Sequence, residues 1–214
     1  MKKNVFATFL IVIFSFSMSV KADYIKANYG FSSLADNVTK HANYSGTKID
    51  TDDEGYSVTA GINVFSNIGV EAMYYDLGTT TITGSKGDVI TFDKADYQFS
   101  KDGTVKNDTS GYGIGFFGTT GDSSGFLSFS ATGRLGVHVW DRSGSTTAIT
   151  DTSSTLKNSF YNDGADLYYG IEIDTGITES MSFNISLDGM SFADSGLSTD
   201  DMATMIGLGL KLNF

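Results

Sequence analysis

The last eleven residues of the chain, 204–214, alternate strictly between apolar side chains and a mixed set of other side chains. One parity holds Ile206, Leu208, Leu210, Leu212 and Phe214, and the other holds Met205, Gly207, Gly209, Lys211 and Asn213. Because successive side chains of a β-strand point to opposite faces, a period of two predicts a strand with one apolar face. The same pattern recurs along the rest of the chain.

Seven further segments show this alternation, and they cover residues 24–31, 56–65, 68–77, 111–117, 126–140, 165–174 and 181–189. The connections between the segments alternate in length. Four are long and polar (32–54, 78–110, 141–163 and 190–201), and three are short (66–67, 119–124 and the turn through Gly176). Long and short connections in alternation are typical of a transmembrane barrel, whose long loops lie outside the cell.

A soluble eight-stranded barrel of the lipocalin type is the structural alternative, since it uses the same alternation with the apolar face turned inward. In this chain the polar parity is small and rich in glycine, which makes it a poor coat for a surface exposed to water. The sequence therefore predicts an all-β fold, an eight-stranded antiparallel transmembrane up-and-down β-barrel.

The first 22 residues have the three parts of a secretory signal peptide. Lys2 and Lys3 form a basic start, residues 5–16 are apolar, and residues 20–22 form a small-residue cleavage site. The apolar part is shorter than the roughly 20 residues that a membrane-spanning helix needs. We therefore expect a signal peptide at 1–22 and a barrel domain at 23–214.

The mature chain is strongly acidic. Cleavage removes Lys2, Lys3 and Lys21, which leaves 11 of the 14 basic residues against all 25 acidic residues, a net charge of −14. Proteins that bind nucleic acid usually present a concentrated basic face, so we expect no nucleic-acid partner. The chain has no cysteine, and hence neither disulfides nor thiol chemistry.

Several glycine- and aromatic-rich segments resemble the OmpA-like family of outer-membrane barrels. They are residues 68–78, 133–141, 170–173, 177–179 and 208–214. The resemblance implies a place in the outer membrane of a Gram-negative bacterium, in contact with its lipid. It also implies that Leu210, Leu212 and Phe214 serve as the signal read by the barrel-assembly machinery. Family members commonly add a periplasmic domain that binds peptidoglycan, a role not carried over to this barrel.

Charged residues also occur at inward positions of the predicted strands. Glu71, Arg134 and Glu172 have the inward parity, and the family resemblance implies that such residues form an ion-paired plug. We expect an interior network of Glu71, Arg134, Glu172 and Lys211, in which two carboxylates converge on the guanidinium. Charges enclosed in a narrow barrel need partners.

Lys26 and Asp188 can supplement this network. The chain departs from the family at Asn184 and Ser186, where an arginine and an acid are typical. The sequence leaves open whether the network gates a small pore or only fills the interior.

No residue pattern predicts catalysis, a cofactor or a metal site. His138 is the only histidine on a predicted strand, and it points inward, whereas lipid-modifying barrels of the deacylase kind use a triad that faces the membrane. The acidic run at residues 50–54 lacks the spacing of a calcium loop, which favours a solvated acidic loop. We therefore expect a protein that is not an enzyme.

Three functions compete. The first is a structural or surface-exposed outer-membrane protein, with a role in adhesion or envelope integrity and loops that meet a host or surface ligand. The second is a narrow channel for ions or small solutes, because inward glycines at 61, 111, 113, 115, 170, 207 and 209 would leave unfilled space. The third is a lipid-modifying enzyme, which would lose activity in His138→Ala.

Aromatic girdles are expected at the lipid interfaces. Their members are Tyr29, Tyr56, Tyr74, Tyr112, Tyr169 and Phe214.

Overall fold

The fold was described from a computed structural model. The structure describes residues 23–35, 47–92, 95–121, 125–146, 149–151, 159–192 and 202–214. The predicted signal peptide, residues 1–22, lies outside the described residues and stays a prediction.

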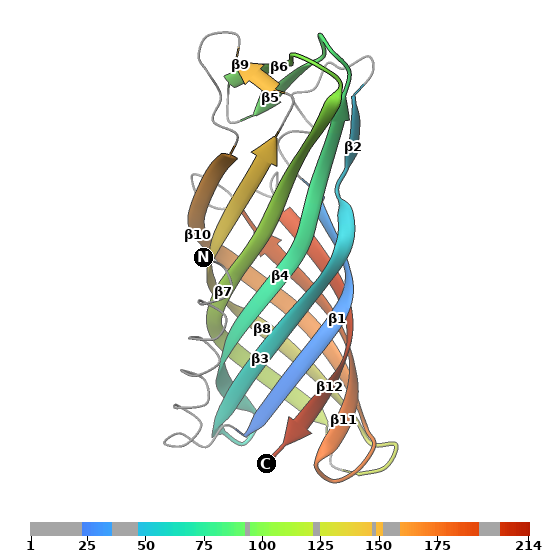
Figure 1. Ribbon diagram of the computed structural model, residues 1–214. Coiled ribbons are helices and arrows are strands. Elements are labelled where there is room, and N and C mark those ends of the chain that lie inside the picture. The colour runs from blue at the N-terminus through green and yellow to red at the C-terminus, as the bar shows by residue number, and fades with distance from the viewer. Residues whose placement is uncertain are drawn as a thin grey trace.

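Eight strands close into a barrel (Figure 1). They are β1 (Tyr24–Ala35), β3 (Asp52–Phe65), β4 (Ile68–Gly84), β7 (Gly103–Gly121), β8 (Phe129–Thr146), β10 (Ser159–Gly176), β11 (Met181–Ser191) and β12 (Met202–Asn213). Each strand pairs antiparallel with the next in chain order, and β12 pairs with β1 to close the sheet. This is the predicted eight-stranded antiparallel up-and-down barrel, and the fold class is confirmed.

The pairing register defines how strongly the strands are staggered. Starting at Gly176 on β10, the register passes through Ser182, Lys211, Lys26, Thr59, Met73, Gly113 and His138 and returns to β10 at Asp166. The offset is ten residues (176 − 166). Such a stagger tilts the strands by about 35–45° from the barrel axis and leaves an interior that side chains just fill.

Apolar side chains cover the outside of the barrel. Leu135, Ile171 and Leu208 are more than half exposed, whereas the inward Met73 and Tyr168 are almost fully buried. The alternation along every barrel strand matches the predicted faces. With apolar residues outside and charged residues inside, the barrel is the inverse of the soluble alternative.

The strands run further than the sequence indicated at one end of the barrel. The predicted loop at 78–110 contains the end of β4 and the start of β7, and the predicted loop at 141–163 contains the ends of β8 and β10. Their polar composition caused the error, because Thr79, Thr81 and Thr83 occupy the outer face of β4 beyond the apolar band and are still paired with β7. We call this end the extended end, and the other the turn end.

Four short strands lie near the extended end. β2 (Lys48–Asp50) pairs with the upper part of β4. β5 (Val89–Phe92), β6 (Ala95–Phe99) and β9 (Ile149–Asp151) form a separate three-stranded sheet, which Figure 1 shows above the barrel. Because β6 comes from the second long connection and β9 from the third, this sheet joins two segments that the sequence treated as independent loops.

Other boundaries also differ from the prediction. β1 continues to Ala35 and β3 begins at Asp52, so the first long connection is shorter than expected. Strand β8 begins at Phe129 rather than at 126, because the chain turns at Leu127, which has a positive φ of 62°. No helix among the described residues is long and apolar enough to cross a membrane.

Candidate functional site in the barrel interior

Seven buried charged residues meet inside the barrel. We call them the ionic cluster: Lys26, Glu71, Arg134, Glu172, Asp174, Asp188 and Lys211. They come from six of the eight strands, and none is more than 7% exposed. Their positions follow from parity, since each occupies an inward site of its strand.

Glu172 is the centre of the ionic cluster. Lys26 Nζ and Arg134 Nη2 both donate to Glu172 Oε2, and Lys211 Nζ lies 3.7 Å from Glu172 Oε1. Lys211 Nζ also donates to Asp174 Oδ2 at 3.1 Å. A single carboxylate therefore faces three cations, which offsets the cost of burying each charge.

Glu71 is held in a different way. Tyr24 and Tyr168 donate their hydroxyl protons to its two carboxylate oxygens, at 2.9 and 3.1 Å. Arg134 Nε lies 3.9 Å from Glu71 Oε1, too far for a hydrogen bond. The guanidinium thus pairs closely with Glu172 and less closely with Glu71, whereas the sequence analysis expected both carboxylates to converge on it.

The structure brings all four expected residues, Glu71, Arg134, Glu172 and Lys211, into the ionic cluster, together with the supplementary Lys26 and Asp188. The sequence analysis missed Asp174. Its position was readable, because it follows Glu172 by two residues and so has the same parity. Asn184 and Ser186 also face the interior, and Ser186 Oγ accepts a hydrogen bond from Asn28.

A second buried group, which we call the apolar cluster, fills the interior nearer the extended end. It consists of Leu34, Met73, Tyr75, Leu77, Trp140, Tyr168, Met190, Phe192, Ala203 and Met205. On β4, Tyr75 lies four residues past Glu71, and on β8, Trp140 lies six residues past Arg134, in both cases toward the extended end. This layer was not foreseen from the sequence, because its members come from six strands and the residue that follows β11.

Inward glycines are covered by aromatic rings. A Cβ added at Gly113, Gly115 or Gly136 would meet the ring or hydroxyl of Tyr168, one added at Gly111 would meet Tyr75, and one at Gly61 would meet Tyr24. The expectation that inward glycines leave unfilled space is wrong. The remaining glycines of that set are filled as well, at 170 by Asp188, at 207 by Ser186, and at 209 by Asn28.

His138 lies inside the apolar layer with both ring nitrogens in use. Its Nε2 lies 2.9 Å from the carbonyl oxygen of Ser191, which can only accept, so Nε2 carries the proton. Its Nδ1 then accepts the hydroxyl proton of Tyr75 at 2.5 Å. These two hydrogen bonds fix the orientation of the ring.

The acidic run at 50–54 is exposed, as expected, but it lies mostly on strands rather than in a loop, since Asp50 ends β2 and Asp52 begins β3. Asp53 accepts hydrogen bonds from the backbone N–H groups of Glu54 and Thr79, at 2.8 and 2.6 Å. Within the described ranges, no three His, Asp or Glu side chains are arranged to hold a metal ion.

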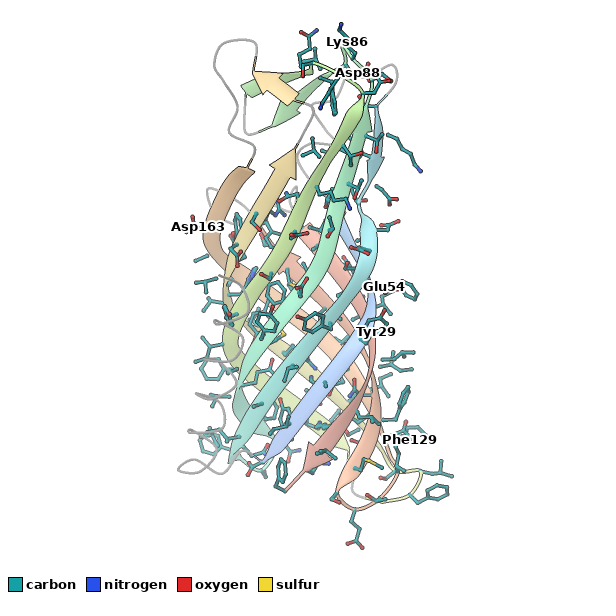
Figure 2. The ribbon with its side chains drawn as sticks, in the orientation of Figure 1. Tyr29, Glu54, Lys86, Asp88, Phe129 and Asp163 are labelled. Atoms are coloured by element: carbon teal, nitrogen blue, oxygen red, sulfur yellow. The ribbon has the colours of Figure 1, made fainter. Side chains whose placement is uncertain are left out.

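Tyrosines form a belt on the outside of the barrel, on the turn-end side of the polar positions Thr79, Thr81 and Thr83 of β4. Tyr29 lies opposite Tyr56 in the register, and Tyr74 is close to both Tyr56 and Tyr112, with ring centroids 5.9 and 5.1 Å apart. In Figure 2, Tyr29 points outward beside Glu54, whose carboxylate accepts its hydroxyl proton. Figure 2 also shows Phe129 at the turn end and Lys86 and Asp88 at the opposite tip.

The fold and the two faces of its wall define an outer-membrane-type β-barrel. No protein-family model and no curated protein matches the sequence. Solved structures of similar fold include Ail, the attachment invasion locus protein of Yersinia pestis, crystallised with the heparin analogue sucrose octasulfate, at 13% identity over 89% of this chain and 97% of that chain (TM-score 0.49).

Two others are Neisserial surface protein A, at 11% identity over 89% of this chain and 96% of that one (TM-score 0.47), and the outer membrane protein OprG of Pseudomonas aeruginosa, at 16% identity over 90% and 97% (TM-score 0.47).

Proposed function

We propose that this protein is a closed, surface-exposed barrel of the Gram-negative outer membrane, with a role in envelope integrity or attachment rather than in transport. The observation that supports it most directly is the pairing of an apolar exterior with an interior filled by the ionic and apolar clusters. An apolar wall requires lipid around it, and a filled interior gives solutes no path.

The part that meets other molecules is the extended end. The strands β4, β7 and β8 continue there with polar outer faces, β10 continues beside β8, and the sheet of β5, β6 and β9 lies above them. We place this end outside the cell, because the long connections of such barrels are extracellular. A host or surface ligand would bind at this end.

The opposite end carries the proposed assembly signal. The apolar side chains of Leu210, Leu212 and Phe214 all face outward, and Phe214 is 73% exposed. The Phe214 N–H donates to the carbonyl oxygen of Asp23 at 2.9 Å, so the last residue is held at the rim. Exposed side chains in one row offer a surface that assembly machinery could read.

Conductance across a planar bilayer tests closure directly. The refolded 23–214 barrel is expected to insert without discrete openings, and a matched barrel known to conduct serves as the positive control. Steady wild-type openings would contradict the proposal and favour the channel hypothesis.

A loop replacement tests the attachment role. Cell-surface binding should disappear when residues 85–102 are replaced by a short turn. Unchanged binding would show that this part of the extended end is not needed.

A further inference from the structure

The interior contains two layers with different chemistry, and only the ionic cluster depends on paired charges throughout. In the ionic cluster, moving one member leaves a buried partner without its opposite charge, since Lys26, Arg134 and Lys211 all face Glu172. The apolar cluster is held by packing, by ring contacts and by the hydrogen bonds of Tyr75 to His138 and of Tyr168 to Glu71. Hydrophobic constrictions of this kind close channels by excluding water.

Phe192 stands apart from the other members of the apolar cluster. Its nine companions lie on barrel strands, whereas Phe192 follows Ser191, the last residue of β11. Its ring contacts His138 and Trp140 edge-on, with centroids 5.5 and 5.3 Å apart, and the Arg142 guanidinium lies 4.4 Å from its centroid. Within the part of the chain that the structure describes, Phe192 has no ladder hydrogen bond to break when its ring leaves the interior.

Tyr168 closes the interior on the side of the ionic cluster, where its hydroxyl donates to Glu71. Its ring covers Gly113, Gly115 and Gly136, three positions on two adjacent strands that have no side chain of their own. Removing the ring would uncover these glycines, although at Gly113 the Cε of Met73 would still lie 3.5 Å from an added Cβ.

The layer nearer the turn end is polar and has an excess of negative charge. The ionic cluster holds three bases, Lys26, Arg134 and Lys211, and four acids, Glu71, Glu172, Asp174 and Asp188. Around it, Ser182 Oγ, both side-chain polar atoms of Asn184 and one oxygen of Asp174 have no protein partner in the described part of the chain. Buried polar atoms of this kind are commonly satisfied by internal water.

We propose that the apolar cluster, and not the ionic cluster, is the closure of the barrel interior, with Phe192 as its displaceable member and Tyr168 as its base. Once this closure is removed, the barrel conducts cations in preference to anions, because the charged layer that remains is net negative. The inference rests on the proposed function, in which the wild-type barrel is closed.

The test compares two sets of variants in planar bilayers, each refolded and checked by circular dichroism. One set removes the closure: Phe192→Ala, Tyr168→Ala and the double variant. Its controls are Phe192→Leu, which keeps an apolar side chain, and Tyr168→Phe, which loses only the hydroxyl bonded to Glu71. The other set perturbs the ionic cluster: Glu172→Gln, and Asp188→Asn in case the first does not refold.

Discrete openings are expected in the double variant, with a reversal potential in a salt gradient shifted toward that of the cation. The wild type, the two controls and the ionic variants should stay silent. Openings in a folded ionic variant together with a silent, folded double variant would overturn the proposal, as would silence in every folded variant. Anion-selective openings would overturn its second part. A conducting wild type would instead refute the proposed function itself.

Discussion

Glu172 is the residue on which the interior charges converge. Its carboxylate faces Lys26, Arg134 and Lys211, so its removal would leave three buried cations to share the remaining acids. The geometry differs from a simple Arg–Glu pair, because the tyrosines Tyr24 and Tyr168 occupy the oxygens of Glu71. Arg134 also faces three acids, Glu71, Glu172 and Asp188, so the network depends on both residues.

Glu172→Gln is therefore expected to lower the free energy of unfolding by roughly 3–5 kcal/mol, the usual cost of breaking a buried ion pair. Equilibrium unfolding in urea, in lipid vesicles, measures the change. The control is Glu179→Gln, which removes an exposed acid from the turn between β10 and β11 and should change stability by less than about 0.5 kcal/mol. Equal stability of the two variants would show that the ionic cluster adds nothing.

Two glycines three residues apart on β8 make a second matched pair. A Cβ at Gly136 would collide with the Tyr168 ring and with the backbone of Ile114 and Gly115, whereas a Cβ at Gly133 meets nothing within 4 Å. Gly136→Ala should therefore destabilise the barrel by about 1–3 kcal/mol. Gly133→Ala should be neutral or slightly stabilising. The free energy of unfolding of each variant measures the difference. An equal loss of stability in both variants would contradict the role given to Tyr168.

At the scale of the elements, the strands are longer than the apolar band that they cross. β4 and β7 stay paired from Ile68↔Gly118 to Gly84↔Gly103, with one irregularity between Asp76 and Thr79. Threonines on the outer face of β4 keep the strand propensity of β-branched side chains while giving a polar surface. The polar ends of these strands thus continue the barrel sheet, and the pairing of β6 with β9 belongs to the separate three-stranded sheet.

Replacing residues 85–102 by a two-residue Asn-Gly turn between Gly84 and Gly103 tests how these elements depend on one another. The barrel should fold normally, because its eight strands remain paired. Backbone amides of β9 should lose protection from hydrogen exchange, since β6 is its partner. Exchange at Thr150 measures this, and amides of β11 serve as an internal reference. Unchanged protection at Thr150 would mean that β9 is held by something other than β6.

At the scale of the whole molecule, the closed sheet separates a lipid-facing wall from a filled interior. The offset of ten residues around eight strands makes the barrel narrow, and the side chains of both interior clusters complete it. The tyrosine belt marks one limit of the apolar band. Beyond it the outer faces are polar, which is the change of surface expected where lipid gives way to water.

A charge placed on the wall should cost most in the middle of the band. Ile185 lies between Ile173 and Leu208 in the register. Ile185→Arg is expected to destabilise the folded barrel in bilayers by about 2–4 kcal/mol. Thr83→Arg, on the outer face beyond the tyrosine belt, should cost about 0–1 kcal/mol. Equal costs at both sites would contradict the position given to the membrane.

The sequence by itself determined the number of barrel strands, their order and the face of each barrel side chain, because alternation is a local property of neighbouring residues. It also placed Glu71, Arg134, Glu172 and Lys211 inside. It could not mark the true strand ends, since a polar outer face in water looks like a loop when membrane depth is unknown.

Only the tertiary structure decided which interior groups meet. Lys26 and Glu172 are 146 residues apart in the chain, and the register around the closed sheet brings them together. The same register placed Tyr168 over glycines of two other strands, and it gathered the apolar cluster from six strands. A stagger is shared by all eight strands, and no single segment encodes it.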